Sequence, residues 1–517
     1  MNGEDRGQAN RTVSKGTVDD RAVRPAASIG AGSDLLQLDP HDAATGGLSG
    51  WLAGRLRRAI ADGRLPVGSR LPPTRLLAAE LRVSRGVVTE AYRRLTEDGH
   101  VVGRGRGGTT VVAAPVTAAA PAAPDTPAMP AASDASAGLF SGTPGTGIFD
   151  AVRAAGARID LSPGVPELAA FPRGAWVRTE RAVLAELPAS ALGYADPRGT
   201  PELRRAAADW LARNRGVRAH PDEVIVVAGT AQALGLAAQV LRADGIARVA
   251  VEDPGALGSR QHLEHWGIDT PPVPVDFRGV RVDALRATGA PAVLLTPAHQ
   301  FPTGVVLDGA RRRELMRWAG GDGGLVVEDD YDAEHRYDRP PVPALRSMLP
   351  ERVLYAGSVS KLLAPALRTG WVLAPPALRD ALVDAKRFAD LGNPVLPQLV
   401  LARLMESGEL ERHLRLIRGR HRRRRDAMIA AIGARLPGAE VHGAAAGLHL
   451  MITFDAGFAD ADLADAALAR GVKTQPLSWH RRRPGPPGLV LGYALNTPAL
   501  IVEGIALIAE ALATVRR

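Results

Sequence analysis

Helical patterns alternate with short β-rich runs along most of the C-terminal part of this chain. The helical patterns cover residues 201–214, 232–242, 310–318 and 399–432, and the β-rich runs cover 224–227, 247–251, 292–295, 325–327 and 353–355. Neighbouring parallel strands need long crossover connections, which helices usually supply. The alternation therefore predicts an α/β domain whose largely parallel sheet is covered by helices on both faces.

Two stretches of biased composition divide the chain of 517 residues. Residues 1–45 are polar, rich in glycine and without periodicity, which predicts a disordered tail. Residues 114–157 are rich in alanine and proline, which predicts a semi-extended linker. We therefore expect a small domain over 46–113 and a larger domain over 158–517.

The small domain is expected to contain three helices and a hairpin. Leucine and isoleucine recur at helical spacing over 48–60. Thr74 is predicted to cap a short helix, and Ser84 is predicted to cap a longer one over 85–97. Two strand-like runs follow, and the glycine- and arginine-rich loop GRGRGG joins them. This order of elements is typical of a helix-turn-helix with a wing.

The charge of the small domain favours a nucleic-acid partner. Residues 46–112 hold twelve arginines and five acids, so 12 − 5 = +7 of the net charge of +9 lies there. A basic helix N-terminus and wing can contact phosphates and guanine edges, although a solvated basic face is the alternative. The candidate DNA-contacting residues are Arg75, Ser84, Arg85, Arg104 and Arg106.

The small domain resembles the GntR-type winged helix-turn-helix nearly end to end. The motifs that carry the resemblance are AIADG at 59–63, LPPTRLLA at 71–78, VSRGVV at 83–88 and GTTV at 108–111. The resemblance implies that Arg75, Arg85 and the wing around Arg106, Gly107 and Gly108 contact operator DNA. Thr89 stands where some relatives carry a further DNA-contacting arginine.

Lysine is almost absent from this chain, and one of the few is a candidate cofactor anchor. The chain has four lysines against sixty arginines, and Lys361 lies in the run SVSKLLAPALRTG. A desolvated lysine amine can form a Schiff base with an aldehyde, whereas a guanidinium does not deprotonate and cannot. Lys361 is therefore a candidate for holding pyridoxal 5′-phosphate (PLP) covalently.

The other groups that a PLP site requires also have candidates. Asp329, at the end of a β-rich run, would hold the pyridine nitrogen, and Tyr331 would donate to the ring oxygen. Thr230 and Ala231 follow a strand and open a helix, where free amides favour a phosphate. Ser358, Ser360 and Arg368 would complete the phosphate site. Each residue alone has an ordinary structural explanation, so the prediction depends on their combination.

The larger domain resembles the fold-type I aminotransferases from about residue 160 to 517. The shared landmarks are YADPRG at 194–199, TPAHQFPTG at 296–304 and EDDYD at 328–332. Behind a GntR-type domain, they make the chain similar to the MocR/GabR family of transcriptional regulators. The resemblance implies an α+β winged helix-turn-helix followed by an α/β fold-type I PLP-dependent transferase domain, with a small C-terminal α/β subdomain over about 395–517.

Three positions depart from the pattern of working aminotransferases. Phe301 stands where the enzymes usually carry an asparagine that donates to the ring oxygen. Val490 stands near the place of a carboxylate-binding arginine, for which one of the three arginines at 481–483 is a possible substitute. Ala256 stands where family members tend to carry tyrosine. The departures at Phe301 and Val490 disfavour efficient turnover, and the departure at Ala256 implies a difference in ring stacking or effector contact.

The resemblance implies a PLP-dependent, DNA-binding transcriptional regulator. PLP or an amino compound would be sensed through an internal aldimine, and the protein would form a head-to-tail homodimer on operator DNA. The alternative is a catalytic aminotransferase with a DNA-binding appendage. Weak or no transaminase activity is expected, with Lys361 as the catalytic residue if the protein is active.

Composition excludes several other classes of site and points to a compartment. The chain has no cysteine, which removes disulfides and thiolate ligands, and no metal site is expected. The first residues lack the apolar core of a secretory signal, and no uninterrupted apolar run of about 20 residues is present. A cytoplasmic protein with no membrane partner is expected.

Overall fold

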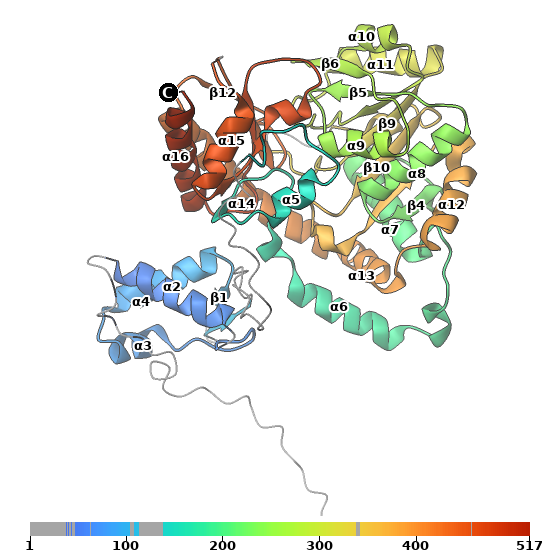
Figure 1. Ribbon diagram of the computed structural model, residues 1–517. Coiled ribbons are helices and arrows are strands. Elements are labelled where there is room, and N and C mark those ends of the chain that lie inside the picture. The colour runs from blue at the N-terminus through green and yellow to red at the C-terminus, as the bar shows by residue number, and fades with distance from the viewer. Residues whose placement is uncertain are drawn as a thin grey trace, which may run out of the picture. The chain divides into compact units, whose positions relative to one another are not determined.

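The chain folds into two compact units, Met1–Pro121 and Ala122–Arg517, each with its own hydrophobic core (Figure 1). The structure is a computed structural model that describes residues 38, 40, 43, 47–62, 64–103, 108–112, 138–337, 342–455 and 457–516. The predicted tail therefore lies almost entirely outside the described residues, as does most of the predicted linker.

The first unit contains the predicted three helices and hairpin. Its elements are α2 (Leu48–Ala61), α3 (Thr74–Glu80), α4 (Arg85–Glu97), β1 (Val101–Gly103) and β2 (Thr109–Val111). Leu52, Leu77 and Leu95 are fully buried between the helices. The predicted cap at Ser84 is confirmed, because its side chain accepts a hydrogen bond from the Val87 amide. The predicted cap at Thr74 is wrong, since Thr74 is the first helical residue and Pro73 precedes it without a side-chain cap.

The hairpin is antiparallel and is held against the helices by backbone bonds. Val101 pairs with Val111, and both side chains are buried in the core of the unit. The Leu71 amide donates to Thr109 O at 2.8 Å, so the loop before α3 is tied to β2. The wing residues Arg104, Arg106 and Gly107 lie outside the described residues.

The second unit is built on an eight-stranded sheet with the order β4-β11-β10-β9-β8-β5-β6-β7. The strands are β4 (Val224–Val227), β5 (Val249–Asp253), β6 (Pro272–Asp276), β7 (Gly279–Val280), β8 (Ala292–Leu295), β9 (Leu325–Asp330), β10 (Val353–Ser358) and β11 (Gly370–Leu373). The strands from β10 through β6 pair in parallel, whereas β11 is antiparallel to both of its neighbours. The predicted, largely parallel sheet is confirmed.

Helices cover both faces of this large sheet (Figure 1). One face packs against α8 (Thr230–Ala243), α9 (Leu257–His265) and α12 (Pro376–Asp390). The other face packs against α7 (Pro201–Arg215), α10 (Val282–Thr288), α11 (Gly309–Gly321) and α13 (Val395–Glu406). Helix α6 (Arg173–Glu186) packs on α13. Short 3-10 turns cover Leu168–Ala170, Ala189–Leu192, Pro221–Glu223, Leu345–Ser347, Pro365–Leu367 and Leu477–His480.

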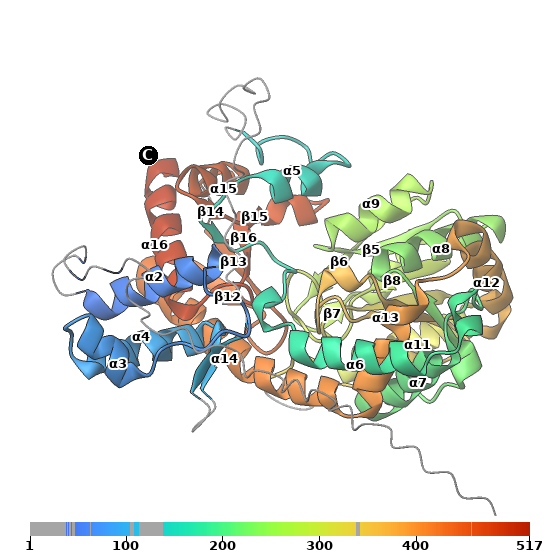
Figure 2. The same ribbon diagram turned by 90° about the horizontal axis from the view of Figure 1, so that it is seen from below.

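The single helix predicted over 399–432 is wrong, because two helices cover this region. The chain leaves α13 after Glu406 and enters α14 (Glu409–Arg435) through Gly408, whose φ is 72°. A left-handed residue ends an α-helix, and glycine adopts this conformation without steric cost. Helix α14 then runs from α13 into the smaller lobe of the unit (Figure 2).

The smaller lobe is an α/β layer around a four-stranded antiparallel sheet, in the order β12-β13-β16-β15. Its elements are β12 (Ala439–His442), β13 (His449–Phe454), β15 (Gln475–Pro476), β16 (Gly488–Gly492), α15 (Asp460–Ala469) and α16 (Pro498–Val515), with β3 (Ile159–Asp160) paired in parallel to β14 (Val472–Lys473). The core also takes in Phe140 and Val152, the latter from α5 (Ile148–Ala154). The end of the predicted linker therefore contributes to this core.

Helix α16 is the one helix in the described part of the chain that is long and apolar enough to cross a membrane. Its residues Ile501, Ile505 and Ile508 are fully buried in the core of the smaller lobe. The helix packs against α14 and α15 and buries one apolar stripe of its surface in this core.

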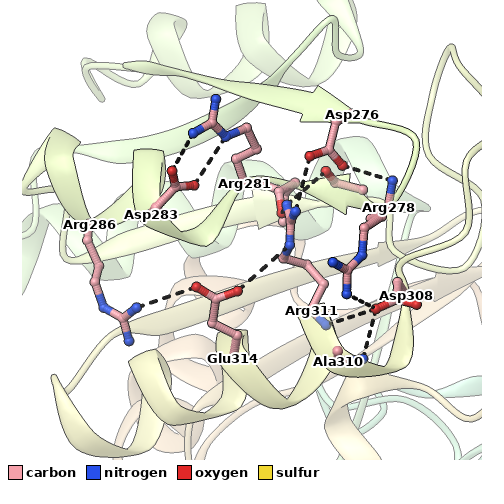
Figure 3. A network of polar contacts seen from close by, with 11 residues as sticks. Asp276, Arg278, Arg281, Asp283, Arg286, Asp308, Ala310, Arg311 and Glu314 are labelled. Atoms are coloured by element: carbon pink, nitrogen blue, oxygen red, sulfur yellow. Dashed lines mark hydrogen bonds and ion pairs between the residues drawn. The ribbon is translucent and has the colours of Figure 1, made fainter.

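Charged side chains join the edge of the large sheet to its nearest helices (Figure 3). Arg311 on α11 contacts Asp276 at the end of β6 at 3.1 Å, and Arg278 contacts Asp308 at 2.8 Å. Glu314 lies 3.8 Å from Arg311 and 3.7 Å from Arg286. Because most of these groups are partly exposed, we expect each pair to contribute little, about 0–1 kcal/mol, to stability.

Candidate functional site

The first unit presents its predicted DNA-contacting residues on one small region around the start of α4. Arg75, Ser84, Arg85 and Thr89 are all exposed. The Arg85 Nε donates to Thr74 Oγ1 at 3.4 Å, which joins the N-termini of α3 and α4. Within the described residues, neither Arg75 nor Arg85 forms an ion pair, so both guanidinium groups are available for an external anion.

The second half of α4 differs, because its arginines are neutralised by neighbouring acids. Arg93 contacts Glu90 at 2.6 Å and also pairs with Glu97, while Arg94 contacts Glu90 at 2.9 Å. The Arg93 and Arg94 guanidinium groups lower the pKa of Glu90 to about 2. The uncompensated charge of α4 is therefore at its N-terminus, the end that enters the major groove in helix-turn-helix proteins.

In the second unit, Lys361 lies just beyond β10, beside the end of β9. Its Nζ donates to the carbonyl of Gly164, and its own carbonyl accepts a bond from His335 Nε2 at 3.1 Å. Gly164 has a φ of 83°, and a Cβ there would lie 3.3 Å from Lys361 Nζ. Burial lowers the pKa of Lys361, although Asp332 and Asp329 partly oppose this. A depressed pKa makes the free amine more available as a nucleophile.

Asp329 is buried at the end of β9, directly beside β10. Burial, followed by the neighbouring Asp330, raises the pKa of Asp329 to about 7. Thr230 Oγ1, on the first residue of α8, donates to Asp329 Oδ1 at 3.4 Å. This bond brings the N-terminus of α8 to the same end of the sheet as Asp329 and Lys361.

Glycine backbone and Arg368 form the surface around the N-terminus of α8, where the sequence predicted a phosphate site. Gly229 precedes the helix with a φ of 80°, and a Cβ there would lie 3.5 Å from Arg368 Nη1. A Cβ on Gly370 would lie 3.0 Å from Ser358 Cβ and 3.2 Å from Gly229 Cα. Arg368 has a φ of 46° and donates to the carbonyl of Ala228. Arg368, Ser358 and the start of α8, which includes Ala231, are thus brought together.

Ser360 lies between this surface and Lys361. Its amide donates to Ser358 Oγ at 3.2 Å, which orders the turn after β10. The structure gives the Ser360 hydroxyl no hydrogen bond among the described residues, whereas its neighbour Ser358 is buried. The prediction that Ser360 helps to hold a phosphate therefore rests on its position in the turn and not on a contact of its hydroxyl.

Tyr331 is hydrogen bonded to a buried histidine that the sequence analysis did not single out. Its hydroxyl donates to His299 O at 3.1 Å and lies 3.1 Å from His299 Nδ1. His299 Nδ1 also lies 2.9 Å from Asp332 Oδ2. The only sequence signal for this contact was that His299 lies in TPAHQFPTG and Asp332 lies in EDDYD, two of the motifs shared with aminotransferases. His299, Asp332 and His449 place potential metal-ligand atoms within 4.8 Å of one another. However, His449 Nε2 donates to Pro302 O, and Asp332 Oδ2 is hydrogen bonded to His299.

The departures at Phe301 and Val490 lie in one apolar cluster. Phe301 packs against a buried group formed by Met451, Leu477 and Val490. Its ring also lies 4.9 Å from the ring of His449 and 5.0 Å from that of His480. Burial lowers the pKa of both histidines to about 3, so they are neutral near pH 7. The surroundings of Phe301 are therefore apolar and uncharged near pH 7.

The arginine-rich loop at 481–483 is engaged elsewhere. Arg482 Nη1 lies 2.8 Å from Glu264 Oε1, and its amide donates to Asp253 Oδ1. Arg481 donates to Pro486 O, and Arg483 Nη2 donates to Pro272 O at 3.5 Å. None of these hydrogen bonds and ion pairs involves a residue of the apolar cluster.

We predict that Asp329→Asn makes the cofactor-free protein less sensitive to rising pH. The pKa of Asp329 is raised from 3.8 to about 7 in the folded protein, so the folded state holds the proton more tightly. The wild type therefore loses stability between about pH 4 and pH 7, up to about 4 kcal/mol from this group alone. The difference in unfolding free energy, variant minus wild type, should rise through this range and then level. Urea titrations at several pH values measure this difference. A difference that does not change with pH would contradict a raised pKa of Asp329.

Family models match both units. The model described as "Bacterial regulatory proteins, gntR family" matches residues 48–111, and the model described as "Aminotransferase class I and II" matches residues 159–481. The folds of the two units agree with this division.

Similar proteins have the same two-part organisation or the fold of the second unit. The chain is 32% identical to the probable rhizopine catabolism regulatory protein MocR of Rhizobium meliloti, over 87% of this chain and 91% of that protein. It is 30% identical to the HTH-type pyridoxine biosynthesis transcriptional regulator PdxR of Corynebacterium glutamicum, over 89% and 94%.

Among solved structures, LysN, the α-aminoadipate aminotransferase of Thermus thermophilus complexed with N-(5′-phosphopyridoxyl)-L-leucine, has a TM-score of 0.64 and 27% identity. The alignment covers 73% of this chain and 97% of LysN. Two independent units thus lead to one assignment. The chain belongs to the MocR/GabR family of DNA-binding transcriptional regulators, in which a GntR-type winged helix-turn-helix precedes an aminotransferase-like domain.

Proposed function

We propose that this regulator binds PLP at Lys361 and that the occupied pocket sets its affinity for operator DNA. The observation that carries the proposal is the meeting of Lys361, Asp329 and the first turn of α8 at one end of the sheet. The aminotransferase class I/II fold of this unit implies PLP dependence. A lysine amine, a carboxyl group and free helix amides are the set of donors that PLP requires.

Each part of PLP has a residue that fits it. Lys361 would hold the aldehyde carbon, Asp329 the ring nitrogen, and Tyr331 the ring oxygen. The phosphate would be held by the residues around the start of α8, namely Thr230, Ala231, Ser358, Ser360 and Arg368. Bound PLP supplies an electrophilic carbon and an electron-withdrawing ring. Because burial raises the pKa of Asp329 to about 7, a protonated ring nitrogen beside it would give the carboxylate a partner and favour its ionised form.

The bound state can act on DNA only through two conformations of different affinity. A ligand shifts such an equilibrium by its differential affinity for the two states. PLP itself is one candidate effector, since the PdxR relative is named as a regulator of pyridoxine biosynthesis. An amino compound that reacts with the bound cofactor is the other, and we propose that this chain responds to one or both.

The residues around this pocket favour a role in sensing an effector over a role in transaminase catalysis. A working aminotransferase must hold the substrate carboxylate and adjust the ring oxygen throughout its cycle. In this chain, Phe301 and Val490 form an apolar cluster at the positions that would supply those contacts. Weak or no transaminase activity is therefore our expectation.

We propose a head-to-tail homodimer that acts in the cytoplasm. Large apolar side chains are exposed on and after α6, including Val177, Leu184, Leu192 and Tyr194, the last with 98% of its surface accessible. Exposed apolar side chains that form a contiguous patch typically mark an interface, and these four follow one another along a single segment of the chain. Two copies would present two DNA-binding units to two half-sites.

Operator binding with and without PLP tests the proposed function. Because the operator is unknown, duplexes are first selected from a randomised pool with the purified protein. Affinity for these duplexes is then measured at fixed salt with the cofactor-free and PLP-loaded protein. The proposal requires different affinities for the two forms. Equal affinities, with and without added amino compounds, would contradict a sensing role.

Arg85→Ala is expected to weaken binding to the selected duplexes by roughly 10- to 100-fold, because one arginine that reads a base contributes about 1–3 kcal/mol. Its exposed guanidinium has no ion pair within the described residues. Arg93→Ala is the matched control, since it removes the same charge from the same helix but Arg93 is neutralised by Glu90 and Glu97. Gel-shift titrations compare the variants, and equal losses would remove the assigned role of Arg85.

A further inference from the structure

A buried histidine and a buried aspartate stand behind Tyr331, the residue proposed to contact the ring oxygen of PLP. His299 follows β8 and Asp332 follows β9, and these two strands pair in parallel, so both loops leave the same end of the sheet. His299 Nδ1 lies 2.9 Å from Asp332 Oδ2, and the two side chains are 0% and 1% exposed. Neither residue belongs to the set proposed to hold PLP.

The hydrogen-bonding pattern shows which nitrogen of His299 carries the hydrogen. A carboxylate only accepts hydrogen bonds, so the Nδ1 that faces Asp332 is the donor. His299 Nε2 is buried and has no hydrogen-bond partner among the described residues, which suits a nitrogen without a hydrogen. The Nδ1 hydrogen also faces the Tyr331 hydroxyl, 3.1 Å away, and can be shared with its oxygen.

Tyr331 is therefore held by His299 at two points. Its hydroxyl donates to the His299 carbonyl at 3.1 Å, while the hydroxyl oxygen can accept from Nδ1 of the same residue. Burial, followed by the charge of Asp332, raises the pKa of Tyr331 well above its usual range, so the hydroxyl keeps its hydrogen near pH 7. Tyr331 thus remains a hydrogen-bond donor, and His299 sets the position of its oxygen.

Close packing holds the His299 ring in this orientation. Gly447 has a φ of 81°, and a Cβ there would overlap the ring and lie 2.8 Å from Asp332 Oδ2. Gly304 has a φ of 71°, and a Cβ there would lie 3.1 Å from His299 Nε2. Two glycines therefore pack closely against the ring, which restricts its rotation.

Phe301 makes the Tyr331 hydroxyl more important for a bound cofactor. Its ring meets that of Tyr331 edge-on, with centroids 6.2 Å apart, and a phenyl ring has no hydrogen to donate to an oxygen. At this position the enzymes usually carry an asparagine that donates to the ring oxygen. Of these two donors only Tyr331 is left in this chain, so the group that positions its hydroxyl also sets the bond to the ring oxygen.

We propose that His299, held by Asp332, is a positioning residue for Tyr331, and that this pair fixes the Tyr331 hydroxyl as the donor to the ring oxygen of PLP. The inference rests on the proposed function, because it requires PLP at Lys361. When PLP binds, the Tyr331 hydrogen turns from the His299 carbonyl to the ring oxygen, and the hydroxyl oxygen keeps the bond from His299 Nδ1. A 3.1 Å bond to a neutral carbonyl is thereby exchanged for a charge-assisted bond to an anionic oxygen.

The visible absorbance of the PLP-loaded protein, titrated with pH, reports on this bond. A hydrogen bond donated to the ring oxygen favours its anionic form, so the loaded site releases its proton at a lower pH. Tyr331→Phe should therefore raise the midpoint of the absorbance titration by about 1 pH unit, a tenfold change in proton affinity, as expected when a charge-assisted bond is lost. His299→Leu should raise the midpoint too, by no more than Tyr331→Phe does.

A double variant separates a positioning role from a general effect on the pocket. If His299 acts through Tyr331, adding His299→Leu to Tyr331→Phe should leave the midpoint where Tyr331→Phe alone places it. His299→Asn should keep most of the wild-type midpoint, because its side-chain amide can donate from the place of Nδ1. If thermal unfolding shows that His299→Leu does not fold, His299→Ala replaces it, since truncation adds no bulk. Asp332 is kept in every variant, because its charge also acts on the pKa of Lys361.

His449→Leu is the matched control. His449 is a second buried histidine, whose ring lies 5.1 Å from that of His299, but its Nε2 donates to Pro302 O. Within the part of the chain that the structure describes, no hydrogen bond joins His449 to Tyr331. This variant should therefore leave the midpoint of the absorbance titration unchanged.

Three results would overturn the inference. The first is a midpoint that His299→Leu does not raise, and the second is a double variant in which the shifts of His299→Leu and Tyr331→Phe simply add. The third is a shift of the same size in His449→Leu. If the loaded wild type shows no visible absorbance, or if Lys361→Ala retains it, the proposed PLP site itself fails, which is a different result.

Discussion

Replacing Lys361 with alanine is expected to abolish covalent attachment of PLP while leaving the protein folded. The side chain makes one hydrogen bond, to the carbonyl of Gly164, so its loss should cost the fold only about 1 kcal/mol. The visible absorbance of the loaded wild type should disappear in the variant. Thermal unfolding of the cofactor-free proteins shows whether the variant keeps its fold.

The other described lysines provide an internal control for this result. Lys386 Nζ lies 2.6 Å from both Asp390 Oδ2 and Asn393 Oδ1, and Lys473 Nζ lies 3.0 Å from Ala155 O and 3.1 Å from Asp160. Both amines are held by several acceptors, and a reactive amine must be free of such partners. After borohydride reduction, mass spectrometry should find the adduct on the peptide with Lys361. An adduct on Lys386 or Lys473 would contradict the assignment.

Replacing Arg215 with methionine is expected to destabilise the second unit by about 3–5 kcal/mol, because it leaves a buried carboxylate without its partner. Arg215 Nε lies 2.6 Å from Asp330 Oδ2, and the two side chains are 0% and 1% exposed. Tyr355 OH also donates to Asp330 Oδ2 at 2.6 Å. Urea unfolding followed by tryptophan fluorescence is suitable, since Trp210 and Trp371 are buried in the adjoining core.

Two variants decide whether the buried charge is the cause of that loss. Adding Asp330→Asn to Arg215→Met removes the unpaired charge, and the amide can still accept from Tyr355, so much of the stability should return. Arg248→Met removes an arginine whose pair with Asp269 is largely exposed, with side chains 47% and 62% accessible. That change should cost at most about 1 kcal/mol. Equal losses for Arg215 and Arg248, or no recovery in the double variant, would contradict the explanation.

Local patterns predicted most elements of both units because their causes are local. The apolar spacing of α4 and the hydroxyl of Ser84 lie within the same few residues, so both the helix and its cap could be inferred. The buried strands β4 and β8 agree with the predicted runs at 224–227 and 292–295. Both runs are buried along their whole length, although β8 lies between two parallel neighbours and β4 is an edge strand antiparallel to β11.

Other boundaries could not be inferred, because competing local signals are nearly equal. Helical periodicity continues across Ser407 and Gly408, so the pattern does not reveal that α13 ends there and α14 begins. Thr74 is a suitable N-cap by type, but Pro73 already takes the extended conformation before the helix. In both places, the residue types alone do not reveal where the helix begins or ends.

The sequence by itself determined the two-part organisation, the classes of fold, and the residues expected to contact DNA and cofactor. These follow from periodicity, charge and motifs that are continuous along the chain. Only the tertiary structure decided that Phe301 and Val490 share one apolar cluster and that Tyr331 is bonded to His299. Such contacts join residues that lie far apart in the chain, so the local sequence carries no signal for them. Burial and close packing in the folded state select which of these residues meet.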